Sequence, residues 1–156
     1  MRKNLFIIII ASLISSGCGF KIDNPTSLSN FYISEIKTSG EKRINYKIKR
    51  KLSYFSKKVG KRAILVNLTT NKNKTVKERN KNNQITKYEI SIVVNIEIKS
   101  LNQPKLTNFT VTKIGDYNAA EQHSATLSKE RILTELLSEN LADEIFNEIT
   151  RRVNDF

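Results

Sequence analysis

The segment from Thr86 to Ser100 alternates apolar and polar side chains almost without interruption. Successive side chains of a β-strand point to opposite faces of a sheet, so this period of two predicts a long strand with one buried face and one wet face. Val93 is the only residue that breaks the pattern. The apolar positions are Tyr88, Ile90, Ile92, Val94, Ile96 and Ile98. A chain that contains this strand must build a sheet and cover one side of it.

Three shorter apolar runs predict further strands, over residues 31–36, 63–69 and 105–114. Gly40 is expected to end the first of them, and Gly115 the last. A turn at 102–104 makes the last run the antiparallel return of the long strand, with Phe109 and Val111 facing the core.

A first amphipathic helix is predicted from Glu41 to Val59, with Gly60 as its stop signal. Its apolar side chains recur at spacings of three and four, at Ile44, Ile48, Leu52, Phe55 and Val59. The opposite face is strongly basic, because ten Lys or Arg residues and no acidic residue lie between Lys42 and Arg62.

A second helix is expected from about Glu121, with Ser128 as a credible N-cap. Its apolar stripe consists of Leu133, Leu137, Leu141, Ile145, Ile149 and Val153. Glu135, Glu139 and Asp143 follow one another at intervals of four residues, where like charges repel. This acidic face therefore predicts a positive neighbour, and the basic first helix is the candidate.

The predicted order is strand, helix, strand, strand, strand, helix. Because a helix and a sheet each bury one face, the expected fold is α+β: a four-stranded mixed or antiparallel sheet with two helices packed on one face.

The chain carries 27 Lys and Arg against 15 Asp and Glu, a formal net charge of +12. Such an excess favours an anionic partner, which could be nucleic acid, anionic lipid or an acidic glycolipid. The segment Thr70–Gln84 is mostly Asn and Lys without apolar periodicity, and we predict a long mobile loop there. Its cations are candidate phosphate contacts, with a solvated surface as the alternative for each of them: Lys72, Lys74, Lys77, Arg79 and Lys81.

Residues 1–17 have the anatomy of a secretory signal peptide. Arg2 and Lys3 make a positive start, and the apolar stretch from Leu5 to Ile14 is about ten residues long, half of what a membrane span needs. Export argues against a nucleic-acid partner.

Cys18 is the only cysteine of the chain, and it directly follows the small residues Ser16 and Gly17. This pattern resembles the bacterial lipobox, although Ser15 stands where the usual Leu would be. In a lipobox the cysteine thiol receives a diacylglycerol and becomes the new N-terminus. The alternative is an ordinary signal peptide with a cysteine nearby. Residue Gly19 is not Asp, which in lipoproteins generally permits transfer to the outer membrane.

Signatures of catalysis are missing from the sequence. The single histidine, His123, has no spaced metal-binding partner, and no serine lies in a Gly-x-Ser-x-Gly motif. We therefore expect no enzyme, no metal and no cofactor other than the covalent acyl lipid on Cys18.

Two segments resemble the lipopolysaccharide-assembly lipoprotein family LptE: the mature start Cys18-Gly19-Phe20, and the ending 137–145, where Leu-Ala-x-x-Ile recurs. Tyr117-Asn118 leading to Ser124-Ala125 also fits the place where members of the family leave the last strand. Together with the element order, the resemblance covers nearly all of residues 18–156.

The resemblance implies two helices against a four-stranded sheet, in a lipoprotein that plugs the outer-membrane barrel LptD and binds lipopolysaccharide. Family members use Lys or Arg for that contact. We expect a cleaved signal peptide at 1–17, a lipidated tether at 18–30 and a single domain at 31–156, on the periplasmic side of the outer membrane. Two alternatives remain open: another periplasmic binding or scaffold lipoprotein, and a module that uses its basic helix to bind anionic membrane surfaces.

Overall fold

The computed structural model describes residues 31–53, 62–101 and 106–154. Within them the elements follow one another as β1 (Phe31–Gly40), α2 (Lys42–Leu52), β2 (Arg62–Arg79), β3 (Ile85–Ser100), β4 (Leu106–Asn118) and α3 (His123–Asn154). The predicted α+β fold and element order are thus confirmed. The predicted signal peptide, Cys18 and the tether lie outside the described residues.

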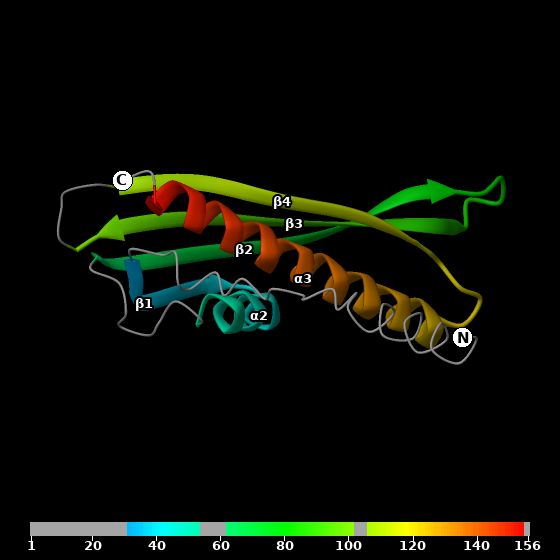
Figure 1. The fold of residues 1–156 in the computed structure, drawn as a ribbon. Coiled ribbons are helices and arrows are strands. Elements are labelled where there is room, and N and C mark those ends of the chain that lie inside the picture. The colour runs from blue at the N-terminus through cyan, green and yellow to red at the C-terminus, as the bar shows by residue number, and fades with distance from the viewer. Residues whose placement is uncertain (1–30, 54–61, 102–105, 155–156) are drawn as a thin grey trace, which may run out of the picture.

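The four strands form one mixed sheet in the order β1-β2-β3-β4. β1 runs parallel to β2, and the other neighbouring pairs are antiparallel. Both helices cover the same face of this sheet, and α3 extends along most of its length (Figure 1). The long strand predicted from its alternation is β3, whose side chains from Ile90 to Ile98 are buried at every second position.

The core lies between the sheet and the two helices. α2 contributes Ile44, Ile48 and Leu52, all at most 1% exposed. The other two predicted apolar positions of this helix, Phe55 and Val59, lie outside the described residues. α3 contributes the stripe predicted for it, with Leu133 partly buried and the others fully buried: Leu137, Leu141, Ile145, Ile149 and Val153. Ala142 is buried beside them.

The prediction of a mobile loop at Thr70–Gln84 is wrong. β2 continues through this segment to Arg79 and pairs with β3 as a long antiparallel hairpin, from Asn71 opposite Val93 to Arg79 opposite Ile85. The physical reason is that a strand as long as β3 needs partners for its backbone N–H and C=O groups along its whole length. Residues with polar side chains can form this part of β2, because their backbone groups hydrogen-bond as well as those of apolar residues.

A tight turn closes the hairpin between Arg79 and Ile85. The Asn80 side-chain oxygen accepts hydrogen bonds from the backbone N–H groups of Asn82 (3.0 Å) and Gln84 (2.9 Å). Asn83 has a φ of 59°, a left-handed conformation that Asn tolerates better than most residues. Only the five-residue tip, which holds three of the five Asn residues of this segment, lies outside the strands.

Two predicted boundaries also differ from the structure. β4 does not end at Gly115 but continues to Asn118. A Cβ atom at Gly115 would lie 2.9 Å from the Cδ1 of Leu133, so this glycine allows α3 to approach the strand closely. α3 begins at His123, which places Ser128 inside the helix rather than at its N-cap.

A polar corner joins β1, α2 and β2. Gly40 has a φ of 86° and is the last residue of β1, which continues four residues beyond its predicted end at Ile36. The backbone N–H of Glu41 then donates to the carbonyl oxygen of Thr70 at 3.2 Å. Asn45, buried on α2, donates to the carbonyl oxygen of Ser39 at 2.9 Å and accepts from the Thr70 hydroxyl at 2.6 Å. This corner fixes where α2 leaves the sheet.

Candidate anion-binding surfaces

The first two candidate phosphate contacts, Lys72 and Lys74, lie on the helix-facing side of β2. Their ammonium groups donate to the two carboxylate oxygens of Glu130 on α3, at 2.9 and 2.7 Å. The Tyr117 hydroxyl donates to the same carboxylate at 3.1 Å. The structure thus brings these two lysines together, but their partner is Glu130 of the same chain and not a phosphate ligand.

Aromatic rings complete this cluster. Tyr88 and Tyr117 stack with centroids 5.4 Å apart, and the Lys74 ammonium lies 4.3 Å from the Tyr88 centroid, within cation–π distance. Burial raises the pKa of the Glu130 carboxyl, but hydrogen bonds from Lys74 and Lys72 outweigh that effect and lower it to about 2. The hydrogen bond to Glu130 raises the pKa of Lys74. Both groups are therefore charged and satisfied at neutral pH.

Lys77 lies on the opposite face of the sheet and bridges two carboxylates. Its ammonium group bonds Asp116 and lies 3.3 Å from Glu89. Glu89 and Asp116 are direct cross-strand partners, so Lys77 neutralises a repulsive pair. The hydrogen bond to Asp116 raises the pKa of Lys77.

The last two candidates lie at the hairpin end. Arg79 donates to the carbonyl oxygen of Asn83 at 2.9 Å. Lys81 is exposed in the turn and makes no ion pair with any residue that the structure describes. Lys81 is therefore the one predicted contact whose ammonium group has no hydrogen-bond or ion-pair partner among the described residues, so a ligand does not have to displace one.

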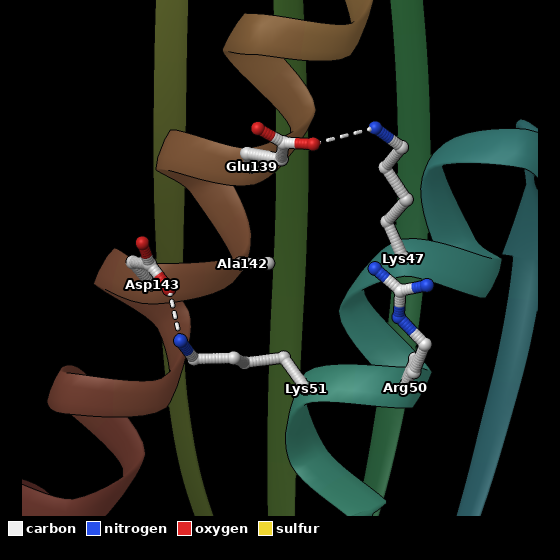
Figure 2. Close-up of a pocket in the computed structure, with 6 residues that line it drawn as sticks. All are labelled: Lys47, Arg50, Lys51, Glu139, Ala142 and Asp143. Atoms are coloured by element: carbon white, nitrogen blue, oxygen red, sulfur yellow. Dashed lines mark hydrogen bonds and ion pairs between the residues drawn. The ribbon is translucent and has the colours of Figure 1, made fainter.

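A groove of about 430 Å³ separates α2 from α3 and carries charges of both signs (Figure 2). Lys47 lies 3.0 Å from Glu139 and 3.6 Å from Glu135, and Lys51 pairs with Asp143. The predicted contact between the acidic face of the second helix and the basic first helix is confirmed. Because Lys47 and Lys51 are matched by carboxylates, they hold the two helices together. Arg50 also lines the groove and forms no ion pair within the described residues.

A second depression lies on the open face of the sheet. It measures about 420 Å³ and is lined mainly by the uncharged polar side chains of Asn67, Thr69, Asn95, Asn108 and Thr110. The Asn67 amide donates to Glu97 at 3.3 Å, while its buried Oδ1 has no partner within the described part of the chain. The alternation of β3 predicted that this face is wet, but nothing in the sequence indicated the depression.

No protein-family model matches the chain, and no curated protein matches it. Solved structures do. Rare lipoprotein B from Shewanella oneidensis aligns with a TM-score of 0.62 at 13% identity, over 77% of this chain and 97% of that one. The fold resembles rare lipoprotein B.

Two further structures agree. Lipoprotein B from Nitrosomonas europaea aligns with a TM-score of 0.58 at 13% identity, over 87% of this chain and 93% of that one. A candidate lipoprotein from Caulobacter crescentus aligns with a TM-score of 0.53 at 15% identity, over 76% and 90%. At such identities the likeness concerns the fold. None of the described helices is long and apolar enough to cross a membrane.

Sequence reasoning missed the partners of the lysines, above all Glu130, Tyr88 and Tyr117. A usable signal was present, because Thr70, Lys72, Lys74 and Val76 continue the period of two of the preceding apolar strand. A search for alternating apolar residues does not detect this continuation of the strand, because most of the alternating side chains are polar.

Proposed function

We propose that this chain is an exported lipoprotein, anchored through an acyl lipid on Cys18 to the periplasmic side of the outer membrane. There it assembles with an LptD-like β-barrel, plugs it and assists lipopolysaccharide transport, without enzymatic activity. The observation that carries the proposal is the shared fold with rare lipoprotein B over nearly the whole length of that structure. Rare lipoprotein B belongs to the LptE family. The sequence motifs of this chain suggest the same family independently.

The physical properties of the chain are compatible with this role. Each CH₂ of an acyl chain that enters the bilayer contributes about 0.8 kcal/mol, so several chains on Cys18 anchor the domain stably. A plug must keep its shape inside a barrel, and ion pairs from the N-terminal half and the middle of α3 tie it to its neighbours, through Glu130 to β2 and through Glu139 and Asp143 to α2.

For lipopolysaccharide, we propose that the hairpin supplies cations to phosphate groups, with Lys81 and Arg79 as the first contacts. Lys72, Lys74 and Lys77 would have to exchange a carboxylate partner for a phosphate, which weakens their contribution. Lys81→Glu should then reduce lipopolysaccharide binding, whereas Lys99→Glu, on the open sheet face, should not. If both variants bind lipopolysaccharide equally well, the hairpin tip does not contact it.

Purification from mild detergent extracts tests the partner. The full-length chain with a C-terminal tag is expected to bring down an outer-membrane β-barrel in stoichiometric amount. Recovery of the protein alone, or with soluble periplasmic proteins only, would contradict the plug function and leave a lipoprotein with a shared fold.

The lipid anchor has its own test. Cys18→Ser should abolish incorporation of labelled palmitate, because the chain has no other cysteine to accept the lipid. The matched control is Ser16→Ala, which preserves a small residue before the cysteine and should label normally. Labelling of Cys18→Ser at the wild-type level would refute acylation at this position.

A further inference from the structure

The outer side of α2 carries a group of cations that no acidic residue neutralises. Lys42, Arg43, Lys49 and Arg50 are exposed, and none of them forms an ion pair within the described residues. Tyr46 lies between them and is 66% exposed. We call these five residues the α2 basic face.

The arrangement follows from helix geometry. α2 turns Ile44, Ile48 and Leu52 to the core, and Lys47 and Lys51 to the acids of α3. The remaining cations form two pairs, Lys42 with Lys49 and Arg43 with Arg50. Members of a pair are seven residues apart, two helical turns or about 10 Å along one side.

This charge distribution is unfavourable for an isolated domain. The four exposed cations have like charges that repel one another, and α2 contains no acidic residue that could pair with them. Lys42 and Arg43 stand in the first turn, where the helix dipole disfavours positive charge, whereas Lys49 and Arg50 stand in the last turn, where it favours positive charge. Most other lysines of the described residues pair with carboxylates. An external anion would relieve this repulsion.

We propose that the α2 basic face docks on the anionic phospholipid surface of the membrane that holds the lipid anchor. Its chemistry fits headgroups, because Lys and Arg bind phosphates and an exposed tyrosine suits the membrane–water interface. Each cation near such a surface strengthens binding about fivefold, so three of them together contribute on the order of a hundredfold.

The proposed anchor brings this surface within reach. Twelve residues lie between Cys18 and Phe31. Even fully extended they span no more than about 45 Å, so the domain stays close to the bilayer. The proposal rests on the proposed function for this proximity, but the affinity of α2 for phospholipid does not depend on the anchor.

The test therefore uses the mature chain from residue 18 onward with Cys18→Ser, which keeps the whole described core and carries no lipid. Its sedimentation with phosphatidylcholine vesicles is compared with that on vesicles of phosphatidylcholine and phosphatidylglycerol. Binding is expected only to the anionic vesicles and should weaken as salt is added.

Two triple variants with the same change in charge and in residue types distinguish the α2 basic face from general basicity. Lys42→Gln, Lys49→Gln and Arg50→Gln should lower the affinity about a hundredfold. Lys99→Gln, Lys129→Gln and Arg131→Gln remove three exposed cations elsewhere and should lower it less than about threefold. Circular dichroism verifies that both variants fold.

Equal losses in both triples would overturn the proposal, and so would binding that does not need phosphatidylglycerol. Binding to lipopolysaccharide micelles but not to anionic vesicles would also overturn it. The assay contains no barrel and no acyl anchor, so its failure leaves the plug function untouched, and failure of barrel co-purification leaves this docking surface untouched.

Discussion

Gly40→Ala is expected to destabilise the domain by about 3 kcal/mol or more, the largest effect of any exposed single substitution that the structure suggests. A φ of 86° already disfavours any residue with a Cβ atom. In addition, the new Cβ would overlap the backbone carbonyl oxygen of Thr70. That oxygen accepts a hydrogen bond from the N–H of Glu41, the residue before α2. A shift that relieves the clash would therefore break this hydrogen bond.

Thermal and denaturant unfolding measure this effect, with an expected drop in Tm of about 10 °C. Gly115→Ala is the matched control. Its Cβ would meet only the flexible ends of Leu133 and Leu137, the nearest atom at 2.9 Å, and these can shift. We expect it to cost about 1 kcal/mol. Equal stability of the two variants would show that the corner at Gly40 adapts and does not determine how α2 leaves the sheet.

The elements that sequence reasoning predicted correctly are those that bury a periodic apolar face. The alternation of β3 and the stripes of α2 and α3 each identify both an element and the face that it buries, since burial imposes the period. The acidic face of α3 was equally informative, because three like charges in a row require a positive neighbour, and Lys47 and Lys51 provide it.

The hairpin beyond Thr70 could not be found in this way. Its stability comes from backbone pairing with β3 and from side chains that meet across elements far apart in sequence, such as Lys74 with Glu130. The positive charge of the lysines predicted that they bind anions. It could not show whether the anion is a phosphate ligand or a carboxylate of the same chain. The depression beside Asn67 is also a tertiary property, because it involves three strands.

Glu130→Gln is expected to destabilise the domain by about 2 kcal/mol at neutral pH. The carboxylate is 18% exposed and receives hydrogen bonds from Lys72, Lys74 and Tyr117. Glutamine keeps the size of the side chain but leaves two partly buried ammonium groups without a counter-charge. Glu35→Gln is the control, because Glu35 and Lys37 are both exposed and 3.8 Å apart, and such pairs contribute less than about 1 kcal/mol.

The pH dependence of unfolding separates charge from packing at Glu130. Its pKa in the folded protein is about 2, below the ordinary value of 4.5. A depressed carboxyl pKa stabilises the folded state above the ordinary value, and this stabilisation is lost as pH falls through the folded pKa. The gap between wild type and Glu130→Gln should therefore be full at pH 7 and shrink between about pH 4.5 and 2. A gap that persists unchanged at pH 2 would assign the effect to packing of the side chain. A gap that closes would show that charge attraction holds α3 to the hairpin, and the hydrogen-exchange protection factors at the Lys74 end of β2 should then fall over the same range.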